Sequence, residues 1–182
     1  VGVLLGMLMG AFRKVDMALD VYVYALLTAP SLVFAPIFFA LFGFKSDGLQ
    51  KTILGIIILY TIWIIVVNTA SAIRSVPTSL VEMGRSYGAS ERQLFFKIIL
   101  PSAAPHLFNG GKFAVAYAVV GVIGAEFLLS SSGIGYQISF TFNSFDAVHM
   151  YAIILLVLVF VAVINAFLLG SEKRLMRRRS AS

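Results

Sequence analysis

Long apolar segments separated by short polar stretches run the length of the chain. Four of them approach the ~20 apolar residues that a helix needs to cross a hydrocarbon core about 30 Å thick. They are residues 21–44, 53–72, 113–129 and 150–169. A fifth, residues 1–12, is shorter; it has no initiator Met and no basic leader, so we interpret it as the remaining half of a spanning helix. The pattern predicts an all-α polytopic membrane protein, a bundle of about five transmembrane helices in this N-terminally truncated fragment and about six in the full chain.

We expect residues 1–182 to form one membrane domain without a linker. The loop after residues 1–12 should make a single interfacial turn, and residues 130–146 should form an outer loop with a tight turn at Gly133-Ile134-Gly135. Pro30 and Pro36 interrupt the first long segment, and proline kinks a spanning helix because it has no amide donor. Such kinks suit the wall of a translocation path, and ordinary packing irregularity explains them about as well.

A polar interlude, residues 75–105, separates the second and third long segments. Pro77 is well placed to begin a helix, since its missing N–H would be unpaired there anyway. Gly88 can end that helix in the left-handed conformation that glycine adopts without penalty. Ser90 is suited to cap the start of a second helix. We therefore expect a hairpin of two short helices.

Both helices of this hairpin are expected to be amphipathic. The apolar or small residues of the first helix are Leu80, Met83, Gly84 and Tyr87, and its other face carries Glu82, Arg85 and Ser86. The apolar side of the second helix consists of Leu94, Phe95 and Ile98, and we expect Pro101 and Pro105 to end that helix and redirect the chain into the bilayer. The result is a compact knob with apolar and charged groups for a soluble partner.

The charges are distributed unevenly between the two sides of the membrane. The chain is 60% hydrophobic and 12% charged, against roughly 25% charged in soluble domains. If the helices alternate, one side receives only Lys45 and Lys51, and the other receives Arg13, Lys14, Arg74, Arg85, Arg92, Lys97, Lys112, Lys173, Arg174, Arg177, Arg178 and Arg179. Because Lys and Arg concentrate on the cytoplasmic side, we expect the hairpin and the C-terminus there. The basic tail then contacts anionic lipid rather than nucleic acid.

Isolated polar residues within the apolar segments are further candidates. Glu126 is a functional candidate because a carboxylate in hydrocarbon is costly unless it is paired or faces a water-filled path. A ligand contact and a structural hydrogen bond to residues 130–135 are about equally open for it. Asn68 is expected to hydrogen-bond across helices. His106 and His149 have no ligand-spaced partners, so we predict no metal, and we find no cofactor site or catalytic group.

The interlude contains a motif with a known counterpart. Glu82-Met83-Gly84, three residues, Gly88, nine residues and then Ile98-Ile99-Leu100-Pro101 have the spacing of a signature commonly written EAA, three residues, G, nine residues, I-x-LP. The chain thereby resembles bacterial ATP-binding-cassette (ABC) transporter permeases that work with a substrate-binding protein. Met83-Gly84 departs from the usual two alanines. The resemblance extends to VGVLLGMLMG, APSLVFAPIFFALFG and VNTASAIRSVP, and GAEFLLSSSGIGYQI is similar to a stretch of the nitrate, sulfonate, taurine and thiamine-precursor group.

The resemblance implies an inner-membrane permease subunit that hydrolyses no ATP itself. Residues 75–105 would be the coupling segment that docks in a groove of a cytoplasmic ABC ATPase subunit. The coupling residues carried over from the motif are Glu82, Met83, Gly84, Gly88, Ala89, Ile98, Leu100 and Pro101. The candidate translocation-path residues are Glu126, Asn68, Pro30 and Pro36.

The same resemblance implies partners and a class of substrate. We expect a permease homodimer, an extracytoplasmic substrate-binding protein and contact with membrane lipid, and no nucleic acid. The expected solute is sulfonate-, nitrate- or taurine-like, with a thiamine-precursor pyrimidine or a flavin as the alternative. A less favoured interpretation is an ion-driven secondary transporter, but such proteins carry inverted repeats and midplane ionisable groups, and here only Glu126 fits.

Overall fold

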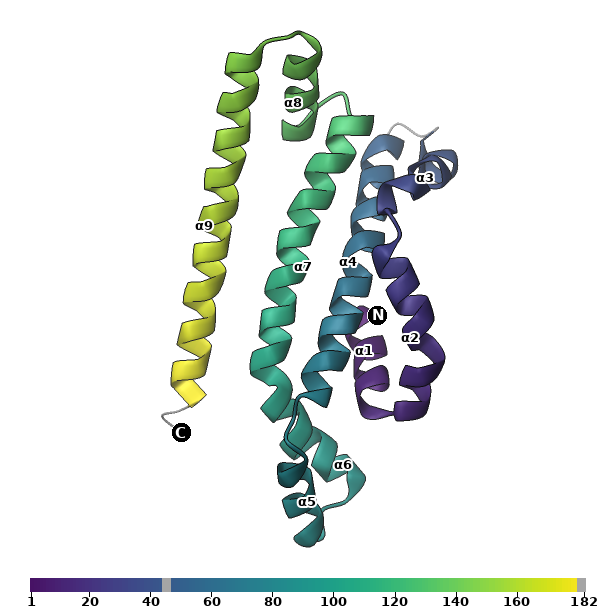
Figure 1. Ribbon diagram of the computed structural model, residues 1–182, viewed down its shortest axis with the longest axis vertical. Coiled ribbons are helices and arrows are strands. Elements are labelled where there is room, and N and C mark those ends of the chain that lie inside the picture. The colour runs from purple at the N-terminus through teal and green to yellow at the C-terminus, as the bar shows by residue number, and fades with distance from the viewer. Residues whose placement is uncertain (44–46, 180–182) are drawn as a thin grey trace. The chain divides into compact units, whose positions relative to one another are not determined.

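The computed structural model describes residues 1–43 and 47–179, of which 171–179 by their backbone alone. Every regular element in these residues is a helix (Figure 1), which confirms the all-α polytopic fold. The elements are α1 (Gly2–Ala11), α2 (Arg13–Thr28), η1 (Ser31–Phe34), α3 (Ala35–Phe42), α4 (Gly48–Arg74), α5 (Thr78–Ser86), α6 (Glu91–Gln93), η2 (Leu94–Ile99), α7 (Leu100–Leu129), α8 (Ile134–Asn143) and α9 (Ala147–Arg179). Lys45 and the side chains of the basic tail lie outside the described residues.

Three helical stretches within the described residues are long and apolar enough to cross a membrane. They are Gly48–Arg74, Glu91–Leu129 and Ala147–Gly170. A fourth span results if the helices Arg13–Thr28 and Ser31–Phe42, which are bent by 86° at the break between them, are counted as one. The apolar helix Gly2–Ala11 is shorter, as its sequence indicated.

The region around the prolines differs from the predicted single kinked helix. Pro30 lies at the break and directly precedes η1, so it interrupts the segment as expected. Pro36 lies in the first turn of α3, where a missing N–H has no helical partner to lose, and it causes no kink.

The predicted interfacial turn is also wrong, because α2 begins at Arg13 directly after α1. Asp16 in the first turn of α2 favours this start, since a carboxylate stabilises a helix N-terminus.

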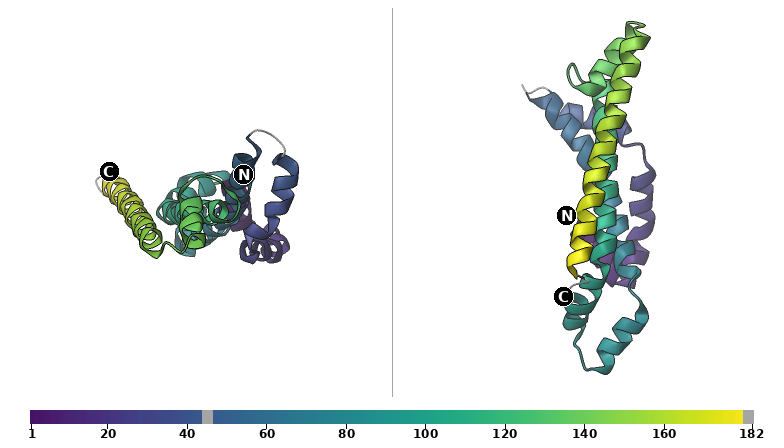
Figure 2. Two further views of the ribbon diagram at one scale, coloured as in Figure 1. Left: turned by 90° about the horizontal axis from the view of Figure 1, so that it is seen from above. Right: turned by 90° about the vertical axis from the view of Figure 1, so that its left-hand side faces the viewer.

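The described residues divide into two compact units, each of which we describe by itself. Unit 1 comprises residues 1–27 and 62–113, and its core joins α1, α2 and the second half of α4. Met9, Val23, Val66 and Ala70 are buried at its centre. An ion pair between Asp16 of α2 and Arg74 of α4 ties the ends of these helices together. The hairpin of α5 and α6 lies at one end of this unit, beyond the last turn of α4, in both Figure 1 and the right-hand view of Figure 2.

Unit 2 comprises residues 28–61 and 114–182. Ala35, Ile56 and Ala125 form its buried core, where α3, the first half of α4 and the second half of α7 meet. Gly121 of α7 faces Tyr60 of α4, and a Cβ on it would lie 3.6 Å from the tyrosine ring, an ordinary van der Waals contact. The neighbouring rings of Tyr60 and Tyr117 are 5.7 Å apart. The short helix α8 packs beside the start of α9 (Figure 1).

Gly6 tests the close contact between α1 and α4. A Cβ on Gly6 would lie 2.6 Å from the carbonyl oxygen of Val66 and 2.6 Å from the Cβ of Thr69, so the two helices would have to separate. We expect Gly6→Ala to reduce the stability of the purified protein by about 1–3 kcal/mol, measured as a lower melting temperature in detergent. Gly111→Ala is the matched control, because a Cβ there meets nothing within 4 Å. Equal shifts for the two variants would contradict this packing.

Candidate functional site

The hairpin between α4 and α7 brings together the predicted coupling residues. Its first helix, α5, starts directly after Pro77 and ends at Ser86. Its second arm consists of α6 and η2 and continues into α7. The hairpin elements α5, α6 and η2 and the adjoining ends of α4 and α7 belong to unit 1. The structure thus confirms a helical hairpin that turns at Gly88, but its second arm is the start of a long helix and not a separate short one.

Gly88 forms the turn of the hairpin with a φ of +75°. The amide of Ala89 donates to the carbonyl of Gly84 (3.1 Å), and the amide of Gly88 donates to the carbonyl of Arg85 (2.9 Å). These two bonds are those of a Schellman motif, in which the residue after the helix cap adopts the left-handed conformation. A Cβ on Gly88 would meet nothing within 4 Å. The position therefore requires glycine because of its backbone conformation, not for lack of space.

A capping box fixes the start of the second arm. The amide of Gln93 donates to the Ser90 hydroxyl (3.4 Å), and the amide of Ser90 donates to the Gln93 side-chain oxygen (2.9 Å). Ser90 was predicted as the cap from the sequence. Gln93 was missed, although the spacing Ser-x-x-Gln is the known signal for this arrangement. An N-cap of this kind contributes about 1 kcal/mol to helix stability.

The two arms contact each other over Gly84. A Cβ on Gly84 would lie 2.5 Å from Cδ1 of Ile98 and 2.6 Å from Cδ2 of Leu94, which is itself 1% exposed. The missing side chain therefore lets the second arm lie directly against α5. The motif usually has alanine at position 84, and here Leu94 and Ile98 occupy the space that the alanine side chain would take.

The outward face of α5 differs from the prediction. Met83 and Tyr87 were expected on the apolar side of the hairpin, but Met83 is 51% and Tyr87 86% exposed. Because the second arm lies close against Gly84, only the face that includes Gly84 is covered. Glu82 is also exposed. Arg85 pairs with Glu91 across the turn at 3.1 Å, with both side chains mostly in solvent, so this pair contributes little stability.

Pro101 and Pro105 do not end the second arm, contrary to prediction. The helix continues from Glu91 to Leu129, with Pro105 inside it. Residues Leu94–Ile99 form a π-helical turn, and the amide of Leu100 donates to the carbonyl of Phe95, five residues back. We infer that this wider turn accommodates the proline ring at position 101, whose lost donor would otherwise break the helix.

The base of the hairpin is firmly packed onto unit 1. Ala72, Ile73 and Ala103 are buried there, with the partly buried side chains of Val76, Phe95 and Ile99 around them. Of the remaining coupling candidates, Ala89, Ile98 and Leu100 are partly buried and Pro101 is exposed. A displacement of α5 would therefore be passed to the ends of α4 and α7 rather than absorbed by a loose loop.

Asn68 lies on α4 in unit 1. Its side-chain amide donates to the carbonyl of Ile64 in its own helix at 2.8 Å, rather than to another helix as expected. The close neighbour across the helix pair is Gly110 of α7, where a Cβ would lie 2.6 Å from the Cβ of Asn68. Asn68 thus stands at a tight crossing of the two helices.

Glu126 binds the start of α8. Its Oε2 accepts a hydrogen bond from the amide of Gly135 at 2.9 Å, which is the structural bond considered from the sequence. Gly133, the N-cap of α8, has no side chain to cap the helix, so the carboxylate from α7 does so instead. A Cβ on Gly133 would lie 2.4 Å from the Glu126 carboxyl carbon, and the φ of Gly133 is +98°. Residues 130–146 are therefore not only a loop, because they contain the helix α8.

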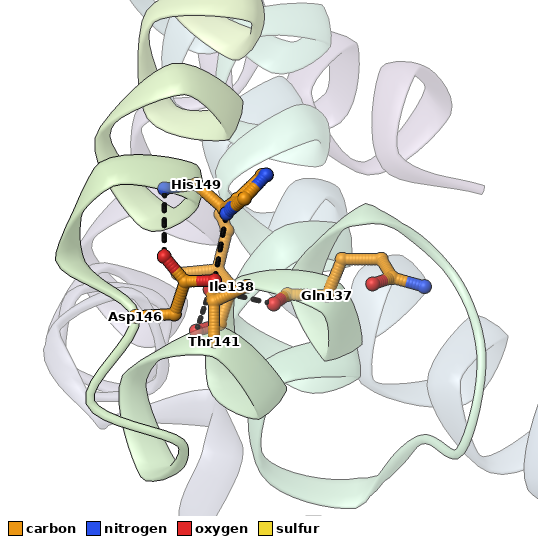
Figure 3. Close-up of polar contacts among 5 residues, drawn as sticks. All are labelled: Gln137, Ile138, Thr141, Asp146 and His149. Atoms are coloured by element: carbon orange, nitrogen blue, oxygen red, sulfur yellow. Dashed lines mark hydrogen bonds and ion pairs between the residues drawn. The ribbon is translucent and has the colours of Figure 1, made fainter.

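Asp146 caps the next helix, α9 (Figure 3). Its Oδ1 accepts from the amide of His149 (3.2 Å), and its Oδ2 lies 2.6 Å from Nδ1 of the same histidine. The backbone hydrogen bond from His149 lowers the pKa of Asp146 below its usual value of 3.8. The stabilising contact is therefore present above pH 3.8 and is lost as the pH falls through the lowered pKa. His149 is therefore not isolated, as its sequence context suggested, because its partner Asp146 lies three residues before it.

Comparison with known proteins identifies relatives along the whole chain. A family model described as "Binding-protein-dependent transport system inner membrane component" matches residues 2–180. The nitrate import permease protein NrtB of Leptolyngbya laminosa is 32% identical over 143 residues, which are 79% of this chain and 50% of NrtB. SsuC of Bacillus subtilis, assigned provisionally to aliphatic sulfonates transport, is 30% identical over 99% of this chain and 64% of its own length. The formylaminopyrimidine transport permease protein ThiX of Halalkalibacterium halodurans is 31% identical over 83% of this chain and 59% of ThiX. The chain thus spans about half to two thirds of the length of these relatives.

A double-mutant cycle tests the contact between Glu126 and Gly133. We expect Gly133→Ala to destabilise the protein less in a Glu126→Ala background than alone, because the side chain that it would strike is gone. The expected coupling free energy is about 0.5–3 kcal/mol, obtained from melting curves or denaturant titrations. Part of the cost should remain, since a φ of +98° disfavours alanine in either background.

Gly121→Ala provides the control for this cycle. A Cβ there makes only ordinary contacts, the nearest at 3.6 Å to Tyr60. Its effect should add to that of Glu126→Ala. Additivity of Gly133→Ala with Glu126→Ala would show that the carboxylate does not lie against the glycine.

Proposed function

The chain belongs to the family of binding-protein-dependent transport system inner membrane components, and we propose that it is the permease subunit of an ABC importer. In this proposal two copies of the chain form the path for a small solute. An extracytoplasmic substrate-binding protein delivers the solute, and cytoplasmic ABC ATPase subunits supply the free energy. The chain itself carries no ATPase activity. It couples the motion of its partners to the opening of the path on alternate sides of the membrane.

The observation that carries this proposal is the shape of the hairpin. Its outward face presents Glu82, Met83 and Tyr87 to solvent, and the last two lie four residues apart on one side of α5. A short helix with exposed apolar side chains and flanking charges suits recognition by a groove on another protein. We propose that the ATPase subunit provides this groove. Lipid is the other possible occupant, and the test below distinguishes the two.

The packing of the hairpin supports a mechanical role. Closure of the ATPase subunits would move α5, and the contact of Gly84 with Leu94 and Ile98 passes that movement to the second arm. The buried base around Ala72 and Ala103 then passes it to the adjoining ends of α4 and α7. Helices moved as rigid bodies are a common means of switching between conformations. ATP-driven motion could thus reach the membrane-spanning part of unit 1 with little loss.

Four residues remain proposed lining groups of the path. Pro30 is supported by the sharp break that follows it, and Asn68 by its place at a tight helix crossing. Glu126 is supported as a carboxylate near the end of a span, although its bond to Gly135 already accounts for one of its oxygens. Pro36 has the weakest support, because it begins a helix and causes no bend.

The orientation in the membrane and the solute are also proposals. Twelve Lys and Arg residues on the side of the hairpin and the tail favour a cytoplasmic C-terminus, in contact with anionic lipid. Relatives named for nitrate and for sulfonates favour a small anionic solute, including one like taurine. The relative named for formylaminopyrimidine keeps a thiamine-precursor pyrimidine, or a flavin, as the alternative.

Substitution of Gly88 tests the coupling role. The φ of +75° is strained for a β-branched residue, so we expect Gly88→Val to abolish solute uptake and the solute-stimulated ATP hydrolysis of the assembled importer. Gly88→Asn is the matched control, because asparagine tolerates this conformation and the space around position 88 is open. It should retain most of the activity. Membrane insertion should be normal in both variants.

Three results would contradict the proposal. Normal ATP-coupled uptake by Gly88→Val would remove the hairpin from the coupling mechanism. Uptake that persists after ATP depletion but stops with an uncoupler would favour an ion-driven secondary transporter instead. Cross-links from Tyr87 to lipid alone, with none to an ATPase subunit, would show that the hairpin lies on the membrane.

A further inference from the structure

The turn between α8 and α9 contains an unusual residue, Phe145. Its φ is +55°, and it is the one residue other than glycine with a positive φ among the described residues. Its side chain is 95% exposed. A bulky residue in the left-handed region is strained by its own Cβ, and an aromatic ring fully in solvent gains nothing from burial. The backbone strain therefore opposes stability, and no burial of the ring offsets it.

The hairpin turn provides an internal comparison for Phe145. At the end of α8, the amide of Asp146 donates to the carbonyl of Thr141 (2.9 Å) and the amide of Phe145 donates to that of Phe142 (3.1 Å). This is the Schellman pattern already described for Gly88, and Phe145 occupies the position that Gly88 occupies there. The chain thus builds the same turn twice, once with the residue that suits it and once with a residue that does not. Glycine at position 145 would make the turn more stable.

Among the described residues of unit 2, no contact accounts for the aromatic ring. Phe145 stands between Ser144 and Asp146, and Asp146 forms the exposed pair with His149 that Figure 3 shows. Val148 beside it is 79% exposed. An energetically unfavourable residue that is retained without an internal reason points to a function outside the chain. Stability given up at a binding surface is a common form of this compromise.

The position along α9 argues against burial of Phe145 in hydrocarbon. The candidate span is Ala147–Gly170, whereas about 20 residues suffice to cross the hydrocarbon core. Whichever 20 or so residues of this span fill the core, Phe145 lies about 3–9 Å beyond its edge. The polar side chains of Asp146 and His149 on the same turn are consistent with an aqueous setting. The ring is therefore available to another protein.

We propose that Phe145 is an anchor for the substrate-binding protein on the side of the membrane opposite the hairpin. This inference rests on the proposed function, in which such a protein delivers the solute. If the helical stretch Glu91–Leu129 crosses the membrane once, the hairpin before it and the α8–α9 turn after it face opposite sides. Aromatic rings that enter a pocket on the partner, surrounded by polar contacts, provide much of the free energy at many protein interfaces. Phe145 supplies the ring, and Asp146 and His149 supply the polar surroundings. The partner chemistry that fits is a folded protein with an apolar pocket edged by hydrogen-bonding groups.

The test measures binding and stability on the same variants. The complete importer is placed in lipid nanodiscs, and its affinity for the solute-loaded binding protein of the same transport system is measured. Phe145→Gly removes both the ring and the strain, so we expect binding to weaken about tenfold or more while the melting temperature stays the same or rises. Phe145→Tyr keeps an aromatic ring and should bind nearly as well as the wild type. Phe12→Ala, at an exposed phenylalanine of unit 1, should leave this affinity unchanged.

The possible outcomes separate this inference from the proposed function. Equal affinity of the wild type and Phe145→Gly would overturn the role of Phe145 while leaving the importer intact. A lower melting temperature of Phe145→Gly in nanodiscs, with unchanged affinity, would assign the ring to lipid and would also overturn the inference. If the wild type binds no such protein, and the Gly88→Val importer hydrolyses ATP as the wild type does, the proposed function itself fails. Weaker binding without loss of stability supports the anchor.

Discussion

The contact of Leu94 and Ile98 with the bare backbone of Gly84 determines the form of the hairpin. It holds the second arm against α5 and decides which side of α5 is covered. Met83 and Tyr87 are left outside as a consequence, next to Glu82. A larger residue at position 84 would require both apolar side chains to withdraw. The surface offered to a partner thus depends on a residue that is not part of that surface.

Small residues also allow other helices to approach one another closely, in both units. Lipid chains are as apolar as the side chains of the helices, so a membrane protein gains little from burying large apolar groups between its spans. Close van der Waals contact becomes the main source of attraction instead. Gly6 and Gly10 on α1 allow the approach to α4 in unit 1, and Ala125 is fully buried in the core of unit 2. These glycines and this alanine are therefore part of the core.

Local signals in the sequence predicted much of this structure. The apolar segments predicted the spans. Gly88 predicted the turn of the hairpin and Ser90 the start of its second arm, because each of these residues acts on the backbone next to it. The expected stop at Pro101 failed because a π-helical turn formed before it. The sequence also could not predict which face of α5 is covered. Helical spacing is compatible with burial of either Gly84 or Met83, and the packing of the second arm determines which one is buried.

The helix α8 was missed for a related reason. Its cap comes from Glu126, nine residues before Gly135 and on another helix, whereas sequence patterns report caps from adjacent positions. The sequence did identify Glu126 as a costly carboxylate and named a bond to this region as one of two explanations. The strain at Phe145 carries no sequence signal at all, because a phenylalanine in an aromatic-rich segment looks ordinary until its backbone conformation is known.

The unbroken helical path from Glu91 to Leu129 makes the hairpin sensitive to chain length. Each residue of an α-helix rotates the chain by about 100° and advances it by about 1.5 Å. One residue inserted or deleted before Leu100 would swing α5 by more than a quarter of a circle around the axis of α7. The number of residues between Gly88 and Ile98 therefore sets the direction, around the axis of α7, in which the hairpin meets its partner.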